Sequence, residues 1–137
     1  MSVSEVITFP KGLPGFEDLK QFVLEEHNEV FSYLKSMDRE EISFIVVDPF
    51  PFFKDYEFKA LEEELNDINY DHEKLSIRTI VTMHSDPQKI TTNLLAPLII
   101  NEGNKQGKQI VLHDTDYKAK HLLWPVSNKD SIESGDI

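Results

Sequence analysis

The chain has no cysteine among its 137 residues. Disulfide bonds, thiolate chemistry and zinc sites built on cysteine are therefore excluded. The longest apolar run, Leu94 to Ile100, is far too short to span a membrane. Met1 to Glu5 lack the basic start and apolar stretch of a secretory signal. We expect a soluble, cytoplasmic protein.

Positive charge is also scarce. The chain has 14 Lys and Arg against 25 Asp and Glu, which gives a net charge of -11. Phosphate backbones and anionic membranes repel such a surface, so direct binding to nucleic acid or to a membrane is disfavoured. The charge favours a basic protein partner because opposite fields speed encounter, although it also simply keeps a protein soluble.

Short β-type segments separated by turn residues make up most of the chain. Proline cannot donate to a sheet ladder, so Pro97 should bend or interrupt the long β segment at residues 91–101. Gly12 to Gly15 should form a turn, and residues 102–107 a hairpin loop. Further strands are predicted at residues 5–9, 22–24, 30–34, 42–47, 75–83 and 108–112.

One helix is predicted, over residues 59–68, where Leu61, Leu65 and Ile68 recur at helical spacing. Many short strands with a single helix favour an antiparallel barrel or sandwich. We therefore predict a mainly β fold: a small antiparallel β-barrel-like single domain over residues 1–126, with one short acidic helix. Residues 127–137 are small and polar and should form a flexible tail.

Catalytic motifs are sparse. No serine lies in a Gly-x-Ser-x-Gly elbow, and no glycine-rich turn of a nucleotide-binding type is present. His113, Asp114 and Asp116 could offer a metal ion one imidazole and two carboxylates, but Asp and Thr are also common turn residues after a strand. We expect no enzymatic activity, no cofactor and no metal.

The most unusual segment is 48–58, which holds four Phe and one Tyr within eleven residues. Aromatic rings are enriched in interface cores, and the alternative is that they plug one end of the barrel. From Asp55 to Lys74 eight acids stand against two lysines, which indicates a solvated face or a docking site for a basic peptide. The candidate partner-binding residues are Phe50, Phe53, Asp55, Tyr56, Glu62, Glu63 and Glu64, with Asn93, Leu94 and Pro97 from the bent segment.

Five segments in a fixed order resemble the flagellar assembly factor FliW family. Each motif alone is modest, but the ordered set, which spans residues 7 to about 117, is specific. The segments are 7–17 (ITFPKGLPGFE), 44–50 (FIVVDPF), 55–57 (DYE), 93–101 (NLLAPLIIN) and 107–109 (GKQ).

The resemblance implies a compact β-barrel-like fold, no catalysis and two alternative protein partners. One is flagellin, held in the cytoplasm before export. The other is CsrA, an RNA-binding repressor of flagellin translation. A free family member would bind CsrA away from its RNA-contacting surface and weaken RNA binding allosterically, while abundant flagellin would occupy the family member and leave CsrA free.

One feature departs from the family pattern. Only six residues precede Ile7, where family members usually have a further short strand and turn. This leaves open whether the barrel closes at that edge, since an unpaired edge strand would be a site for pairing. Two other functions are alternatives: a metal protein or enzyme that uses His113, Asp114 and Asp116, and a general secretion chaperone for several export substrates.

Overall fold

The computed structural model describes residues 4–124. The predicted tail at 127–137 lies outside these residues. The helical elements are α1 (Glu62–Asn66) and the 3-10 turn η1 (Pro87–Lys89). The strands are β1 (Ser4–Thr8), β2 (Gln21–Glu26), β3 (Phe31–Ser36), β4 (Ser43–Val47), β5 (Leu75–Thr82), β6 (Thr91–Thr92), β7 (Leu98–Asn101), β8 (Gln106–Gln109) and β9 (His121–Leu122).

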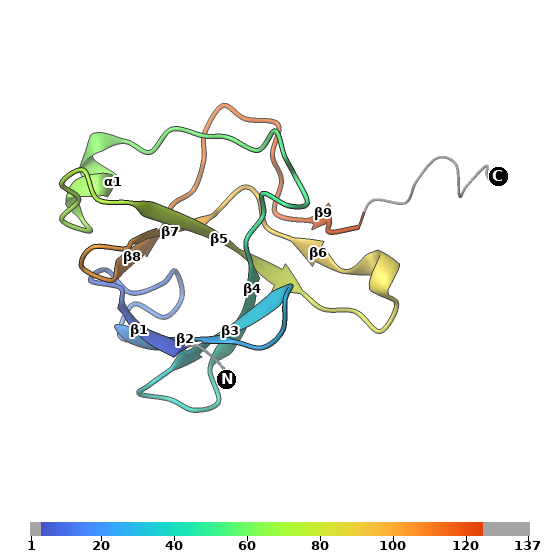
Figure 1. The fold of residues 1–137 in the computed structure, drawn as a ribbon, viewed down its shortest axis with the longest axis horizontal. Coiled ribbons are helices and arrows are strands. Elements are labelled where there is room, and N and C mark those ends of the chain that lie inside the picture. Colours follow the sequence, from blue (N-terminus) through green and yellow to red (C-terminus); the bar gives the residue numbers. More distant parts are fainter. Residues whose placement is uncertain (1–3, 125–137) are drawn as a thin grey trace.

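Seven strands form a closed ring in the order β1, β2, β3, β4, β5, β7 and β8 (Figure 1). Every pairing in the ring is antiparallel except β1 with β8, which is parallel. β6 and β9 extend the sheet from the end of β5, beyond the ring. The predicted fold class, a mainly β barrel-like domain with one short helix, is confirmed.

The ring closes at β1 despite the short sequence before Ile7. β1 pairs with β2 along its whole length and meets β8 at Thr8 opposite Gln106. The Thr8 N–H donates to the Lys105 carbonyl at 2.9 Å. Lys105 Nζ lies 2.8 Å from Glu5 Oε1 and 2.5 Å from Glu102 Oε1, so an ion pair crosses the junction. The seam is narrow, but β1 is not a free edge.

The barrel interior is filled by alternate side chains of the ring. Phe9 and Phe22 are fully buried and meet edge to face, with their ring centroids 5.5 Å apart. A Cβ at Gly107 would lie 2.9 Å from the Phe9 ring, so only glycine fits beside this ring pair. The buried interior residues are Ile7, Phe9, Leu13, Leu19, Phe22, Leu24, Leu34, Val46, Leu98 and Ile100.

A second apolar layer covers the outside of β4, β5 and β7. Val46 and Ile100 belong to the interior, whereas their neighbours Val47 and Ile99 face outward and are also buried. Long connections supply the cover: Phe52 and Phe53 pack with Val47, Val81, Ile90 and Leu123, and Phe58, Leu65 and Leu112 pack with Ile68, Ile99 and Ile110. The interpretation that the 50–58 rings plug one end of the barrel is therefore wrong, because these three rings pack against the outer wall.

The helix is shorter than predicted. It spans Glu62–Asn66 instead of 59–68, because Leu61 is its N-cap, with extended backbone at φ -74° and ψ 151°. Phe58 and Ala60 pack on the outer cluster from the extended segment before it. After the helix, Asn69 has a positive φ of 52°, which ends the helical path of the chain. Tertiary packing has overridden the helical propensity of Lys59 and Ala60.

The segment at 91–101 bends as Pro97 predicts, but it divides into two strands. Residues 93–97 leave the sheet between β6 and β7. The Asn93 side chain caps the bend by accepting hydrogen bonds from the Leu95 and Ala96 N–H groups, both at 3.0 Å. β8 begins at Gln106, inside the predicted hairpin loop, and ends at Gln109, three residues before the predicted end of the strand.

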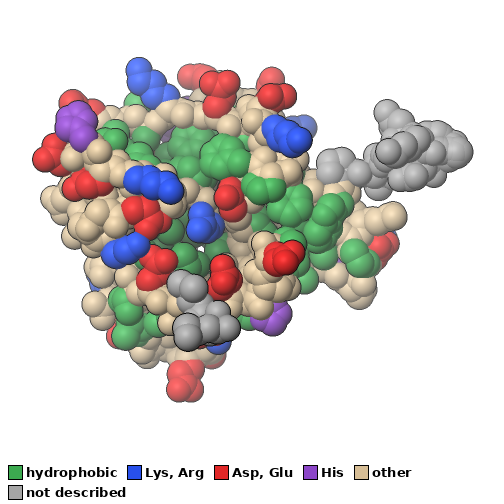
Figure 2. Space-filling model, viewed as in Figure 1, with side chains coloured by type: hydrophobic (Ala, Val, Ile, Leu, Met, Phe, Trp, Pro, Cys, Tyr) green, Lys and Arg blue, Asp and Glu red, His purple; other side chains and the backbone are tan. Residues whose placement is uncertain are grey.

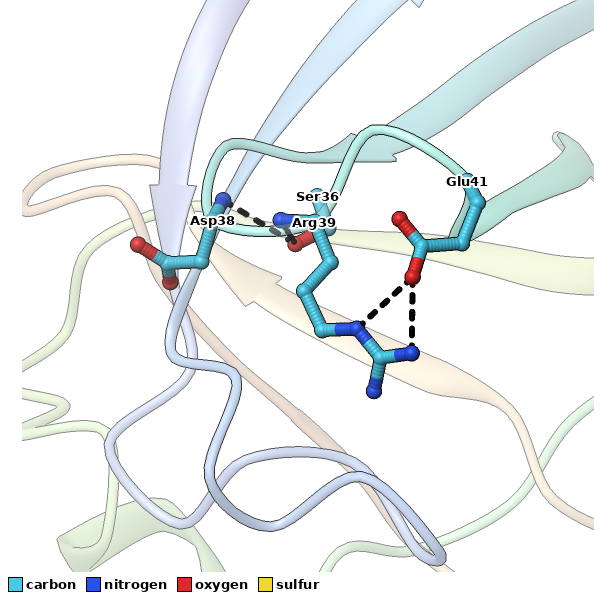
Figure 3. Close-up of polar contacts among 4 residues, drawn as sticks. All are labelled: Ser36, Asp38, Arg39 and Glu41. Atoms are coloured by element: carbon cyan, nitrogen blue, oxygen red, sulfur yellow. Dashed lines mark hydrogen bonds and ion pairs between the residues drawn. The ribbon is translucent and has the colours of Figure 1, made fainter.

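A buried serine fixes the turn between β3 and β4 (Figure 3). Ser36 Oγ accepts hydrogen bonds from the Asp38 N–H at 3.1 Å and the Arg39 N–H at 3.0 Å. Arg39 then reaches outward and donates twice to Glu41 Oε2, at 2.9 and 2.7 Å. Ser36 is 6% exposed, whereas the side chains of Arg39 and Glu41 are both more than half exposed.

Candidate functional site

The aromatic segment leaves β4 through two tight turns. Asp48 Oδ1 accepts a hydrogen bond from the Phe50 N–H at 3.1 Å. The Pro49 carbonyl accepts from the Phe52 and Phe53 N–H groups at 3.0 and 2.8 Å. These local bonds are typical of Asx and proline turns. Both Phe52 and Phe53 pack against the cluster of Val47, Val81, Ile90 and Leu123.

Tyr56 joins the aromatic segment to the bend at 93–97. Its side chain is 4% exposed, and its hydroxyl donates to the Leu94 carbonyl at 2.7 Å. The ring centroid lies 4.7 Å from Tyr117 and 6.0 Å from Phe50. Burial, with a smaller effect of Tyr117, raises the pKa of the Tyr56 phenol well above its usual range. The hydroxyl therefore stays protonated and remains a hydrogen-bond donor.

The bend itself lies mostly inside the molecule. Leu94 and Pro97 are buried, and Asn93 is half-buried. The Leu94 and Leu95 N–H groups donate to the Lys118 carbonyl, and the Pro97 carbonyl accepts from the Ile110 N–H. Asn93, Leu94 and Pro97 thus hold the connections that pack around the bend. That they contact a partner directly stays a prediction.

The other candidates lie at or near the surface. Phe50 is 40% exposed, and Asp55, Glu62 and Glu63 are exposed. Glu64 is half-buried, and its Oε1 accepts a hydrogen bond from the Leu61 N–H at 3.3 Å. Phe53 is half-buried, and its ring centroid lies 6.1 Å from that of His121. The ten candidates therefore include exposed, half-buried and buried residues.

Glu57 and Phe58 line two hollows at the surface. One measures about 270 Å³, and its walls include Phe50, Tyr56 and Ile77. The other measures about 420 Å³ and lies between the segment before α1 and the segment after β8. These two connections run close together at the top of Figure 1, and Figure 2 shows apolar side chains at the surface there with acidic and basic side chains around them.

The larger hollow holds residues that the sequence did not single out. Val111 and Thr115 line it together with Leu61 and Glu64. Val111 is 50% exposed although the sequence predicts it within a strand. The sequence pattern here is a predicted strand at 108–112 that ends in apolar residues, and this pattern indicated that Val111 is buried. Only the three-dimensional neighbourhood of α1 makes these residues part of a surface.

The metal alternative gains no support from the geometry. His113 and Asp114 line the larger hollow, and Asp114 has a positive φ of 54°, as in a turn. Within residues 4–124, no group of three or more His, Cys, Asp or Glu side chains is arranged to hold a metal ion. The same part of the chain contains no helix long and apolar enough to cross a membrane.

Comparison with known proteins identifies the family. The family model described as FliW protein matches residues 1–123. The chain belongs to the FliW family. A flagellar assembly factor FliW from Clostridium botulinum (strain Alaska E43 / Type E3) is 48% identical over 120 residues, which is 85% of each protein. One from Clostridium tetani (strain Massachusetts / E88) is 41% identical over 128 residues, 91% of this chain and 88% of the relative.

A solved structure has the same fold. The crystal structure of a flagellar assembly factor FliW superposes with a TM-score of 0.84 at 34% identity. The alignment covers 88% of this chain and 86% of that one. The family resemblance inferred from the five ordered segments is thereby confirmed.

Several residues of the FliW-like segments have structural roles. Gly12 has a φ of 69°, and a Cβ there would lie 2.6 Å from the Glu17 backbone, so this turn requires glycine. Asn101 is fully buried, donates to the Ile68 carbonyl at 3.2 Å and accepts from the Gly103 N–H at 2.9 Å. These segments therefore define the barrel, and the partner-binding surface has to be sought among exposed residues.

Proposed function

We propose that this chain is a non-catalytic flagellar assembly factor that regulates flagellin synthesis by exchanging two protein partners in the cytoplasm. It binds flagellin when flagellin is plentiful. When free, it binds the translational repressor CsrA and allosterically weakens the binding of CsrA to flagellin mRNA. The observation that carries this proposal is membership of the FliW family, whose relatives at 41% and 48% identity are named flagellar assembly factors.

The physical properties of the chain are consistent with this role. A repressor that binds RNA has to present positive charge, and this chain has a net charge of -11. Opposite charges favour encounter with such a partner and disfavour contact with the RNA itself. A switch between two complexes follows from mass action and needs no chemistry on this chain.

The exposed candidates are the proposed contacts. Phe50, Asp55, Glu62 and Glu63 are accessible, and the half-buried Phe53 and Glu64 lie beside them. Tyr56, with Asn93, Leu94 and Pro97, would act from beneath by holding this surface in place. The proposed division is between residues that touch a partner and residues that position them.

Competition binding tests the switch directly. The full chain is immobilised, loaded with purified CsrA and then washed with increasing concentrations of flagellin. We expect flagellin to displace CsrA, and an unrelated unfolded export substrate to leave the complex intact. Retention of neither protein at micromolar concentrations would contradict the proposal, and equal displacement by the unrelated substrate would favour a general secretion chaperone.

An RNA-binding titration tests the allosteric step. The affinity of CsrA for a flagellin mRNA leader is measured at rising concentrations of this chain. Allosteric antagonism weakens the affinity to a finite plateau, because both ligands can occupy CsrA with a fixed coupling free energy. Direct competition for the RNA site would instead weaken it without limit. Binding of the RNA to this chain alone would count against the scheme.

A further inference from the structure

We propose that the barrel opens locally at the seam between β1 and β8, and that Lys105, held between Glu5 and Glu102, is the latch that keeps this seam shut. The two strands lie next to each other at the left of Figure 1. The inference concerns the barrel itself and goes beyond the proposed partner exchange. It makes closure of the ring depend on one cation and on ionic strength.

The seam is the shortest pairing in the ring. β1 meets β8 at one residue pair, Thr8 with Gln106, and the two strands run parallel there. Every other pairing in the ring is antiparallel and extends over at least three consecutive residue pairs. Parallel pairing is slightly less stable per residue, and the regions that open most readily have few backbone bonds to break. The ring should therefore open first at this seam.

One residue makes both kinds of contact across the seam. The Lys105 carbonyl accepts a hydrogen bond from the Thr8 N–H at 2.9 Å, and the Lys105 Nζ lies 2.8 Å from Glu5 Oε1. The same ammonium donates to Glu102 Oε1 at 2.5 Å. The two carboxylates, Glu102 first, raise the pKa of the Lys105 ammonium, so the latch keeps its positive charge.

Glu5 depends on this cation. The Glu5 side chain is 31% exposed, but its Oε1 is shielded from solvent and has no hydrogen bond within residues 4–124. The ammonium of Lys105 is therefore the group that offsets its charge. A shielded carboxylate that loses its counter-ion is destabilised more than a fully solvated one. Opening the seam lets water reach Glu5, so removing the charge of Lys105 should favour the open state.

The surrounding structure allows the seam to open without unfolding the barrel. β1 is paired with β2 along its whole length, and the Phe9 N–H donates to the Lys20 carbonyl at 2.7 Å. On the other side of the seam, the Lys105 N–H donates to the Asn101 carbonyl at 2.8 Å, which holds Lys105 at a positive φ of 58°. Each side keeps its own bonds, so β1 and β2 can move together away from residues 105 and 106.

Hydrogen exchange of the full chain, followed by NMR at low concentrations of urea, tests the local opening. The Thr8 amide reports on the seam, and the amides of β3 report on a strand that is paired on both sides. Local opening exposes little surface, so exchange of the Thr8 amide should not depend on urea, whereas exchange of the β3 amides should rise with urea as in global unfolding. If the Thr8 amide follows the β3 amides, the proposal is overturned.

Two matched pairs of neutral variants test the latch. Glu5→Gln and Lys105→Gln remove one charge at the seam, whereas Glu25→Gln and Lys35→Gln remove one charge from an ion pair of 2.9 Å across the fully paired β2 and β3. Exchange of the Thr8 amide should be about threefold faster in Glu5→Gln and about tenfold faster in Lys105→Gln, because only the second variant leaves Glu5 without its counter-ion. The two control variants should change this rate by about twofold or less.

Salt gives an independent readout on the unaltered chain. Between about 50 mM and 1 M NaCl, screening should speed exchange of the Thr8 amide relative to the β3 amides, and this response should be absent in Lys105→Gln. Equal effects of the seam and control variants, or no response to salt in the unaltered chain, would overturn the latch. The salt and urea series need no substitution, so they decide the question even where a variant fails to fold.

Discussion

Strands β1 to β4 form one wall of the barrel, and residues 48–61 and 110–120 form a cover on its outside. Both contain aromatic and aliphatic residues, but they differ in backbone regularity and in how fully these side chains are buried. In the wall, strands pair in regular registers and alternate side chains point into the barrel. In the cover, the backbone is irregular, and it is held by hydrogen bonds that involve side chains together with a few backbone bonds to residues 94–97. Phe22 in the wall is fully buried, whereas Phe50 in the cover is 40% exposed.

This difference separates stability from recognition. Burial of apolar area dominates the folding free energy, so the wall should carry most of the stability. The cover buries part of each ring against the outer face of β4, β5 and β7 and leaves the rest accessible. Substitutions in the wall should therefore unfold the protein, and substitutions in the cover should change binding with smaller effects on folding.

The largest contrast is expected between two phenylalanines. Phe22→Ala should lower the free energy of unfolding by about 3–5 kcal/mol, because it removes a fully buried ring and leaves a cavity. Phe50→Ala should cost about 1 kcal/mol or less, because its ring is already partly hydrated. Urea unfolding followed by tryptophan fluorescence gives both values. Similar losses for the two variants would contradict the division between wall and cover.

A smaller loss is expected where the segment after α1 is tied to the end of β7. Asn101→Ala should cost about 1–3 kcal/mol, because it removes a buried side chain that donates to the Ile68 carbonyl and is the acceptor of the Gly103 N–H. Asn104→Ala is the matched control. Asn104 also donates to the Ile68 carbonyl, at 3.0 Å, but its side chain is exposed, so its loss should cost less. Equal costs in urea unfolding would show that burial of Asn101 is unimportant.

A third effect concerns a single hydroxyl. Tyr56→Phe keeps the ring and removes the donor to the Leu94 carbonyl, which should cost about 1 kcal/mol. Tyr117→Phe removes only an exposed acceptor of the Glu57 N–H and should cost less. Thermal unfolding of both variants measures the difference. No loss in Tyr56→Phe would show that the backbone bonds and the Asn93 side chain hold the bend at 93–97 without the Tyr56 hydroxyl.

The same hydroxyl makes the alkaline stability of the protein a second test. The pKa of Tyr56 is raised in the folded protein, so above about pH 10 the unfolded chain releases a proton that the folded chain keeps. Stability should therefore fall as the pH rises from there. Tyr56→Phe lacks this contribution, and its stability should fall less steeply over the same range.

The sequence predicted the parts of the fold that depend on local patterns. The turn at Gly12 to Gly15 and the bend at Pro97 follow from backbone restrictions that glycine and proline carry wherever they occur. The alternation along 75–83 predicted a strand, but not that both of its faces would be covered. The outer layer depends on contacts between residues far apart in the chain, which no local period reports.

The candidate site was predicted in pieces. The aromatic segment and the bend at 93–97 were both singled out, but the hydrogen bond from Tyr56 to the Leu94 carbonyl, which joins them, spans 38 residues. Glu57, Val111 and Asp114 line the same hollow, which the sequence did not predict because these residues come together only when two long connections fold over the same wall. Helix α1 is shorter than predicted, because the helical spacing of residues 59–68 does not show that Phe58 and Ala60 pack on the outer cluster from an extended segment.

The smallest expected effects lie in the turn between β3 and β4, where buried and exposed polar contacts occur side by side (Figure 3). Ser36→Ala should cost about 1 kcal/mol, because the Asp38 and Arg39 N–H groups lose a shared buried acceptor. Arg39→Ala breaks the ion pair with Glu41, but both side chains are solvated, so the melting temperature should not change measurably at physiological salt. A larger loss in Arg39→Ala than in Ser36→Ala would mean that surface charge, not a buried hydroxyl, fixes this turn. It would also weaken the view that stability in the wall comes from what is buried.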